Sequence, residues 1–235
     1  PYRKLSRQLA GAFASAIVTL TEQDAQNYGQ NLKCKRAKIL TISNPMTPQR
    51  KHEYNPKSRT IVSAGRLTYQ KGFDMLIDVA AQVLPQHPNW QWLVLGEGED
   101  HDALVEKTDQ RGLSAQLHFP GRTDNLSSYL EQAAFFVMTS RFEGLPMVLL
   151  EAKSYGLPLI SFDCETGPRE IILDGTNGYI IPCFDVVSMA EHINTLVDND
   201  SERSSLSKYS TLNSSKFEPA SIVEQWTNLI YEITK

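Results

Sequence analysis

From Arg59 onward, short apolar runs alternate with amphipathic segments, and this alternation restricts the fold more than any other feature of the chain. Short apolar runs bounded by turns are typical of buried strands, whereas apolar residues at helical spacing indicate helices. Strands that alternate with helices form a parallel sheet covered by helices on both faces. We therefore expect an α/β fold with a Rossmann-like, doubly wound parallel sheet. The expected strands are residues 60–64, 90–95, 117–119, 135–139, 158–162 and 178–181, and the expected helices are 72–84, 102–108, 126–133, one from about 145, 186–197 and 222–233.

The first 45 residues are expected to belong to a different domain from the rest of the chain. Residues 1–45 hold one further strand–helix–strand unit, which is too small to bury a core of its own. We interpret it as the last part of a preceding N-terminal Rossmann domain. Residues 46–58 are polar and contain two prolines, as linkers do. The main domain is then expected at residues 59–217, and residues 218–235 should form a C-terminal helix that packs back on the first unit.

Composition argues against several classes of partner and location. The 235 residues carry a formal net charge of -4 and a pI near 5.8, which argues against a broad nucleic-acid-binding face. Cys34, Cys164 and Cys183 are far apart, as expected of free thiols in a reducing compartment. No apolar stretch reaches the roughly 20 residues that span a bilayer, and no secretory leader opens the chain. We therefore expect a cytoplasmic protein and, because the first residue is Pro1, a piece of a longer chain.

A loop with two cations and two glycines follows the first expected strand. It runs from Gly65 to Gly72 and contains Arg66 and Lys71. In doubly wound sheets, ligands bind at the loops that follow the carboxyl ends of the strands. Arginine offers a planar fork and lysine a movable point charge, and the two together suit a diphosphate. Taken singly, each cation would more often be an ordinary surface charge, but their shared position favours an anion site.

Two carboxylates eight positions apart lie around the start of the helix that follows the fourth expected strand. Gly144 allows the backbone to approach a ligand closely, and Pro146 suits the first turn of a helix, so we expect the helix to begin near Leu145. Its first N–H groups and its dipole favour an anion such as phosphate. Glu143 precedes this turn, and Glu151, about one and a half turns into the helix, can accept hydrogen bonds from hydroxyl groups. The alternative is that Glu143 is a solvated loop acid and Glu151 a surface acid.

Other motifs carry weaker signals. Residues 93–99 look like the start of a dinucleotide-binding fingerprint, but the third glycine is absent because His101 occupies its place. The five histidines form no cluster with the spacing of metal ligands, so no metal site is expected. Gly167 and Pro168 begin a short helix whose turn is a second, weaker candidate for facing an anion.

Three groups of residues in this order resemble a known family. They are residues 65–67 with 71–72, residues 142–146 with Glu151 completing a Glu-x7-Glu motif, and residues 166–172 with the turns at 174–175 and 177–178. From about Arg59 to its end, the chain resembles the carboxyl-terminal, donor-binding half of retaining glycosyltransferases of the two-Rossmann GT-B fold. These are enzymes of the glycosyltransferase group 1, or family 4, type. Within them, the chain looks most like the bacterial enzymes of capsule and lipopolysaccharide biosynthesis.

The resemblance implies a role for each matching residue. It places Glu143 beside the donor sugar as the catalytic residue, and Glu151 at the ribose hydroxyls. Arg122 lies in the loop that holds the base in this family. The donor-binding residues implied in full are Gly65, Arg66, Lys71, Arg122, Gly144, Leu145, Pro146, Met147 and Glu151. The resemblance implies no metal and no other cofactor.

The implied reaction is the transfer of a hexose or N-acetylhexosamine from a nucleotide-diphosphate sugar, with uridine as the expected nucleoside, to a glycan or lipid-linked glycan with retention. The missing N-terminal domain would bind the acceptor and would bring any peripheral contact with the inner face of the cytoplasmic membrane, so we expect this chain alone to be inactive. No nucleic-acid partner is expected. Two alternatives remain: a non-catalytic nucleotide-sugar-binding module, and a sugar-nucleotide epimerase of similar fold, which the Glu-x7-Glu spacing disfavours.

Overall fold

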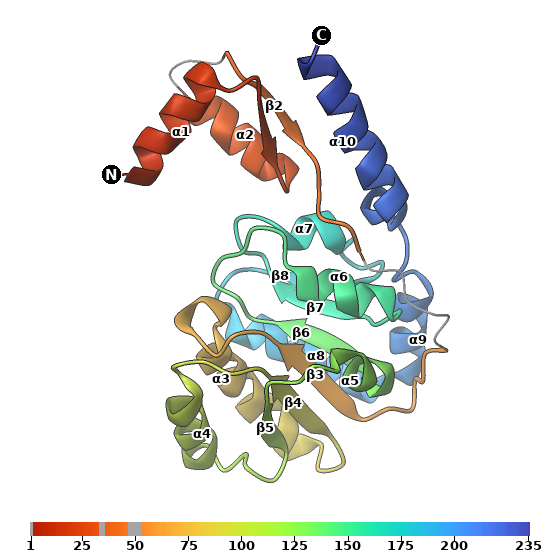
Figure 1. Ribbon diagram of the computed structural model, residues 1–235. Coiled ribbons are helices and arrows are strands. Elements are labelled where there is room, and N and C mark those ends of the chain that lie inside the picture. The colour runs from red at the N-terminus through yellow and green to blue at the C-terminus, as the bar shows by residue number, and fades with distance from the viewer. Residues whose placement is uncertain (1, 33–35, 47–52) are drawn as a thin grey trace.

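The computed structural model describes residues 2–32, 36–46 and 53–235. Its main domain is a six-stranded sheet in which every neighbouring pair is parallel (Figure 1). The order across the sheet is β5-β4-β3-β6-β7-β8. The predicted α/β fold with a doubly wound parallel sheet is therefore confirmed. The strands are β3 (Thr60–Ala64), β4 (Gln91–Leu95), β5 (Leu117–Gly121), β6 (Phe135–Met138), β7 (Leu159–Phe162) and β8 (Gly178–Ile181).

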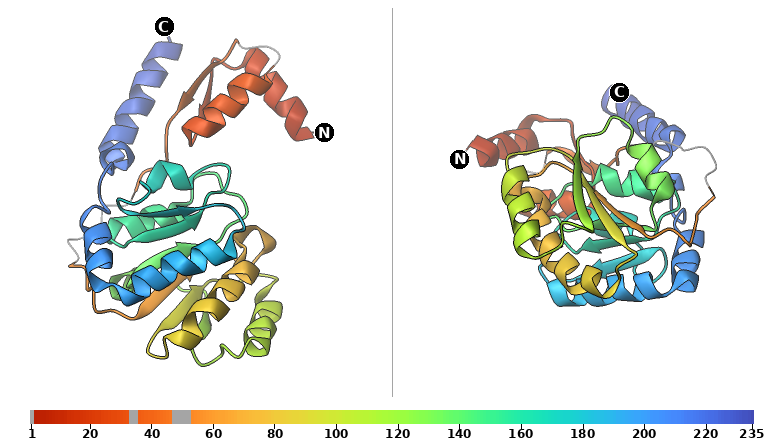
Figure 2. Two further views of the ribbon diagram at one scale, coloured as in Figure 1. Left: turned by 180° about the vertical axis from the view of Figure 1, so that it is seen from behind. Right: turned by 90° about the horizontal axis from the view of Figure 1, so that it is seen from below.

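Helices cover both faces of this sheet (Figures 1 and 2). The apolar residues of α3, α4, α8 and α9 form one core with one side of the sheet, and those of α5, α6 and α7 form a second core with the other side. Neighbouring strand residues alternate between the two cores, because successive side chains of a strand point to opposite faces. The helices are α3 (Phe73–Val83), α4 (His101–Gln110), α5 (Leu126–Gln132), α6 (Met147–Ser154), α7 (Pro168–Ile171), α8 (Val186–Asp198) and α9 (Asp200–Lys208), with short 3-10 turns η1 (Tyr69–Lys71), η2 (Leu84–Gln86) and η3 (Ser215–Phe217).

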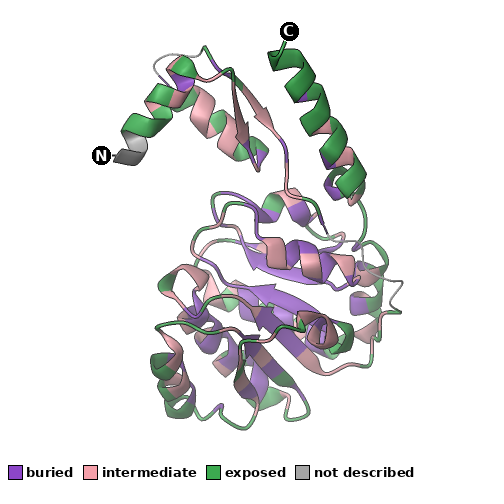
Figure 3. Ribbon diagram, in the orientation of Figure 1, coloured by how far each residue is buried: buried purple, intermediate pink, exposed green. Residues whose placement is uncertain are grey.

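The chain reverses its direction of travel across the sheet between β3 and β6. From β3 it adds β4 and then β5 on one side, and it returns to place β6 on the other side of β3. All four residues of β6 and all four of β7 are buried, as expected for central strands covered on both faces (Figure 3). Crevices for ligands form where neighbouring strands send their connections in opposite directions, so the loops after β3 and β6 frame the expected site.

The first part of the chain forms a separate small unit, here called the N-terminal unit. It consists of α1 (Tyr2–Phe13), β1 (Ala16–Thr19), α2 (Glu22–Asn31) and β2 (Lys38–Thr41), with β1 and β2 paired in a parallel two-stranded sheet. The last helix, α10 (Pro219–Ile233), runs beside this unit (Figures 1 and 2). Its Ile222 and Leu229 share a buried cluster with Ile42, next to β2. Lys38 and Glu232 form an ion pair at 2.6 Å across the same contact.

Two segments connect the N-terminal unit and α10 to the main domain, and they touch each other. The backbone N–H of Met46 donates to the carbonyl of Phe217 at 2.7 Å. Met46 is the first residue of the expected linker, of which residues 47–52 lie outside the described residues. Phe217 is fully buried in the same core as α6. The two connections are therefore joined where they leave the main domain.

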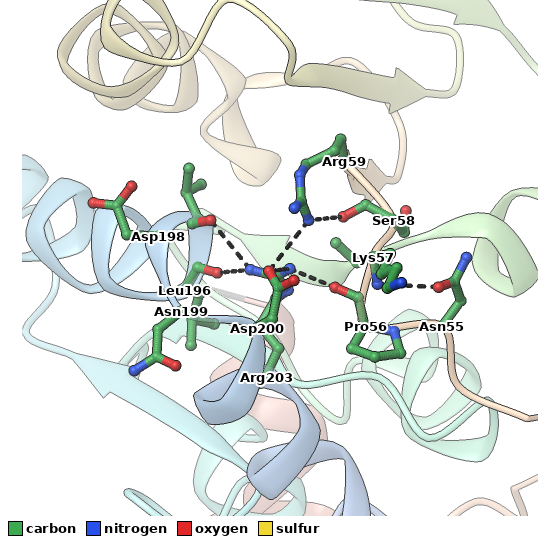
Figure 4. A network of polar contacts seen from close by, with 12 residues as sticks. Asn55, Pro56, Lys57, Ser58, Arg59, Leu196, Asp198, Asn199, Asp200 and Arg203 are labelled. Carbon is green, nitrogen blue, oxygen red and sulfur yellow. Dashed lines mark hydrogen bonds and ion pairs between the residues drawn. The ribbon is translucent and has the colours of Figure 1, made fainter.

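Arg203 on α9 anchors the chain just before β3 (Figure 4). The Arg203 side chain is fully buried, and its guanidinium lies 5.1 Å from the centre of the Trp90 ring. It donates to the carbonyl of Pro56 at 2.5 Å and to Asp200 Oδ1 at 2.5 Å. It also donates to two carbonyls at the end of α8, those of Leu196 and Val197. One cation thus holds three segments together.

Lys153 on α6 is a second buried cation, and it has no carboxylate partner among the described residues. Its Nζ donates to the carbonyl of Ser210 at 2.5 Å and to that of Ile171 at 3.4 Å. Burial lowers the pKa of Lys153 from 10.5 to about 8. Between these two values the unfolded chain binds this proton more tightly than the folded protein does.

We therefore expect Lys153 to contribute a rise of about 1 kcal/mol in the free energy of unfolding between pH 8 and pH 9, as the folded protein loses a buried charge. Lys153→Met should remove this rise. Urea denaturation of both proteins between pH 7 and pH 9 measures the difference. Burial also raises the pKa of Cys164 and of Cys183, which has the opposite effect on stability, but that effect cancels when the two proteins are compared. The same pH dependence in both would contradict this assignment.

None of the helices in the described residues combines the length and apolar character needed to cross a membrane.

Candidate functional site

The loops after β3 and β6 meet in an ion pair at the switch point of the sheet. Lys71 ends η1, after β3, and Glu143 lies in the loop after β6. Lys71 Nζ lies 2.6 Å from Glu143 Oε1, and the two side chains are only 16% and 7% exposed. The sequence analysis predicted each residue separately and missed this pairing. No local pattern indicates it, because the partners are 72 positions apart.

Glycines allow the Lys71 loop to lie against its neighbours. A Cβ at position 65 would stand 3.2 Å from two carbons of the Lys71 side chain, so Gly65 makes room for the lysine stem. Gly72 has a φ of 65°, and a Cβ there would stand 2.2 Å from the carbonyl oxygen of Thr139. The Thr139 hydroxyl in turn donates to the carbonyl of Lys71 at 3.2 Å. The backbone of the lysine is thus fixed against the end of β6.

A second ion pair joins the loop after β6 to the first turn of α3. Arg141, two residues before Glu143, makes a bidentate contact with Asp74 in the first turn of α3, at 2.8 and 2.6 Å. Its guanidinium also lies 4.0 Å from the centre of the Tyr69 ring. Hydrogen bonding to Arg141 lowers the pKa of Asp74, and the same contact raises the pKa of Arg141. The sequence analysis missed this brace, which holds the loops in register.

The start of α6 differs from the prediction. The helix begins at Met147, and Pro146 is its N-cap, with extended backbone angles of φ -74° and ψ 97°. The expected start near Leu145 was therefore wrong by two residues. A proline disfavours helical backbone angles at the residue before it, so Leu145 cannot begin the helix. The loop after β7 packs closely on this turn, because a Cβ on Gly167 would stand 2.3 Å from the Gly144 carbonyl oxygen and 2.4 Å from Pro146 Cδ.

Most of the sequence-predicted site residues surround one hollow, here called the strand-end pocket. It has a volume of about 420 Å³ and lies at the amino end of α6. Burial raises the pKa of Glu151, which is half-buried in its wall. Gly144 belongs to the turn beside the pocket but does not line it. The predicted residues that line it are Gly65, Lys71, Glu143, Leu145, Pro146, Met147 and Glu151.

Two of the other predicted residues line an adjoining pocket of about 380 Å³. Arg66 and Arg122 lie there, and Gly65 belongs to both pockets. Arg66 is exposed, and Arg122 is 69% exposed in a 3.4 Å contact with Glu97. The two pockets share Ala64, Gly65 and Leu126 in their linings, so they adjoin at the end of β3. The two adjoining pockets are here called the trough.

A third cavity, of about 600 Å³, lies between the N-terminal unit and the main domain. The sequence analysis missed it, because its walls come from segments far apart in the chain. Glu143 lines this inter-unit cavity as well as the strand-end pocket. Asn27 donates to Glu165 across it at 3.1 Å. Its other described walls include Arg7, Asp24, Tyr28, Asn31, Phe142 and Thr166.

The described residues include no group of three or more His, Cys, Asp or Glu side chains arranged to hold a metal ion. The trough is lined by three cations, Arg66, Lys71 and Arg122, and by three carboxylates, Glu97, Glu143 and Glu151, and it lies at the amino end of α6. A helix amino end and basic side chains bind phosphate groups, and carboxylates bind hydroxyl groups.

The sheet order and the trough at its switch point define a Rossmann-like domain that binds its ligand at the strand ends. Residues 47–212 match the family described as Glycosyl transferases group 1, and the chain belongs to this family. The predicted family is thus confirmed.

Known proteins agree with this assignment. The chain is 31% identical over 222 residues to the amylovoran biosynthesis glycosyltransferase AmsD of Erwinia amylovora, covering 92% of this chain and 62% of that protein. It is 29% identical over 229 residues to an uncharacterized glycosyltransferase of Haemophilus influenzae, covering 97% and 64%. A crystal structure of an S. aureus TarM mutant in complex with fondaparinux, alpha-GlcNAc-glycerol and UDP matches with a TM-score of 0.90 and 26% identity, over 97% of this chain and 46% of that one. The chain therefore spans less than two thirds of the length of these relatives.

Proposed function

We propose that this chain is the donor-binding half of a retaining glycosyltransferase. The complete protein would transfer a hexose or N-acetylhexosamine from a nucleotide-diphosphate sugar, with uridine as the preferred nucleoside, to a glycan or lipid-linked glycan. The observation that carries this proposal is the strand-end pocket, in which Lys71, the amino end of α6 and Glu151 surround one space in a chain of the glycosyltransferase group 1 family.

The chemistry of such a transfer suits these groups. When the bond between sugar and diphosphate breaks, negative charge grows on the leaving phosphate. Lys71, Arg66 and the positive end of the α6 dipole would stabilise that charge. Glu151 would accept hydrogen bonds from the ribose hydroxyls, and Glu143 would contact the donor sugar. Arg122, at the far end of the trough, would lie beside the base. We propose no metal and no other cofactor.

The acceptor and the setting of the reaction are proposed from the relatives. AmsD is named as a glycosyltransferase of amylovoran biosynthesis, and the TarM structure holds UDP and alpha-GlcNAc-glycerol. We therefore propose a glycan or lipid-linked glycan acceptor, reached from the inter-unit cavity and held in part by residues outside this chain. Retention of the anomeric configuration, a cytoplasmic location, and contact with the inner face of the membrane through those residues belong to the same proposal.

A nucleotide-binding assay on this chain tests the donor site. We expect uridine diphosphate at about 100 times its Kd to stabilise the protein by about 2.7 kcal/mol, which raises the Tm by several degrees. Lys71→Met and Arg66→Ala should reduce this shift, because each removes a cation from the diphosphate. Differential scanning fluorimetry with the diphosphates of uridine, adenosine and guanosine measures it.

Lys208→Met is the matched control for this assay, since Lys208 is an exposed cation on α9 that lines neither pocket. Its Tm shift with uridine diphosphate should equal that of the unchanged protein. If none of the three nucleotides shifts the Tm of the unchanged protein, the proposed donor site is wrong.

A further inference from the structure

Lys71, which is proposed to hold the diphosphate, already forms an ion pair with Glu143. Lys71 and Glu143 are 2.6 Å apart and largely shielded from water. Among the described residues that line the strand-end pocket, Lys71 is the one cation, whereas Glu143 and Glu151 are both acids. A diphosphate that enters this pocket therefore meets one positive charge and two negative ones.

We propose that Glu143 makes the pocket discriminate between a nucleoside diphosphate that carries a sugar and one that does not. This inference rests on the proposed function. Free nucleoside diphosphate must bind against the charge of Glu143 and compete with it for Lys71. A sugar-bearing donor has hydroxyl groups that donate hydrogen bonds to the carboxylate, so Glu143 keeps a partner when Lys71 turns to the phosphates. The carboxylate thus favours donor binding and product release.

Contacts to the backbone hold the two loops that carry Glu143 and Lys71. The Thr166 hydroxyl donates to the carbonyl of Glu143, and Gly167 packs against the turn that follows it. On the other side, Thr139 and Gly65 fix the backbone and stem of Lys71. These contacts hold the backbones of Glu143 and Lys71, so only the ends of the two side chains can turn without breaking them. Repulsion between Glu143 and an incoming diphosphate is therefore not relieved by a simple displacement of the loop.

Lysine can serve two partners at once, because its ammonium group has three N–H donors. One can remain on Glu143 while the others reach a phosphate oxygen. We therefore expect Glu143 to weaken the binding of free nucleoside diphosphate without abolishing it. An electrostatic penalty of this kind also shrinks as salt screens the charges.

Isothermal titration calorimetry with uridine diphosphate and with inorganic pyrophosphate tests the proposal. Glu143→Gln keeps an oxygen acceptor for Lys71 and removes the negative charge. We expect this variant to bind both ligands roughly tenfold more tightly than the unchanged protein, a gain that corresponds to about 1.4 kcal/mol. The gain should be smaller in 0.5 M salt, where the Debye length is only about 4 Å. The better-bound of UDP-glucose and UDP-N-acetylglucosamine should gain clearly less than uridine diphosphate does.

Glu106→Gln is the matched control, because it removes the same charge from an exposed position on α4, where Glu106 contacts Gln110. Its affinities should not change. Glu143→Ala provides a second neutral variant, with the same expected direction, in case the glutamine variant does not fold. Equal or weaker binding of uridine diphosphate by the neutral variants, or an equal gain for the sugar-bearing nucleotide, would overturn the inference and leave the donor site intact. Failure of the unchanged protein to bind any of these ligands would instead overturn the proposed function, and this inference with it.

Discussion

Replacing Arg203 by methionine is expected to lower the free energy of unfolding by about 3–5 kcal/mol. Methionine fills much of the arginine's volume but leaves the buried carbonyls of Leu196 and Val197, and the partly buried carbonyl of Pro56, without their donor. It also removes the contact of the guanidinium with the Trp90 ring. Equilibrium denaturation in urea measures the loss, and the midpoint should fall without a change in slope.

Arg59→Met provides the matched control for this experiment. Arg59 also lies over the Trp90 ring, at 5.3 Å, and also contacts Asp200, at 3.3 Å. Its side chain is 40% exposed, however, and water can replace its partners. We expect a loss of about 1 kcal/mol or less, as for other exposed ion pairs. Equal losses in the two variants would show that the buried carbonyl contacts of Arg203 do not carry the stability assigned to them.

Glu143→Ala, made in the complete protein that contains this chain, is expected to reduce sugar transfer by at least about 100-fold, the loss typical when one electrostatic group of an active site is removed. The same variant should still bind uridine diphosphate, because Lys71, Arg66 and the α6 amino end remain. Transfer of a radiolabelled sugar to the acceptor measures the first effect, and calorimetry measures the second.

This pair of measurements separates an enzyme from a binding module. A module that holds nucleotide sugars without catalysis would lose nothing in transfer, so an unchanged rate would contradict the catalytic assignment. Glu106→Ala is the control, since this residue lies on the surface of α4, away from both pockets. The anomeric configuration of the product, read by nuclear magnetic resonance, tests retention in the same reaction.

The sheet was predictable because its determinants are local. Strands such as β6 and β7 are buried on both faces, so they appear in the sequence as unbroken apolar runs. Their alternation with helices predicted a doubly wound parallel sheet, and with it the edge at which loops should carry ligand groups. The helix after β6 was predicted in the right place, but its first residue was not. The helix begins after Pro146, because a proline disfavours helical angles at the residue before it.

The site was predictable as a set of residues but not as an arrangement. Glycines, cations and carboxylates at strand ends indicated which side chains to consider. Their pairing depends on how closely two loops approach, and no spacing along the chain encodes that distance. The Lys71–Glu143 pair and the Arg141–Asp74 brace both arise from this approach. The inter-unit cavity escaped prediction for the same reason, because α2 and the loop after β7 are neighbours only in space.

The hydrogen bond between Met46 and Phe217 has a mechanical consequence. One connection leads from the N-terminal unit into the main domain and the other leads from the main domain into α10, and this bond joins the two connections. The N-terminal unit and α10 are also packed on each other, so they would rotate together relative to the main domain. Such a rotation about the joined connections would widen or narrow the inter-unit cavity.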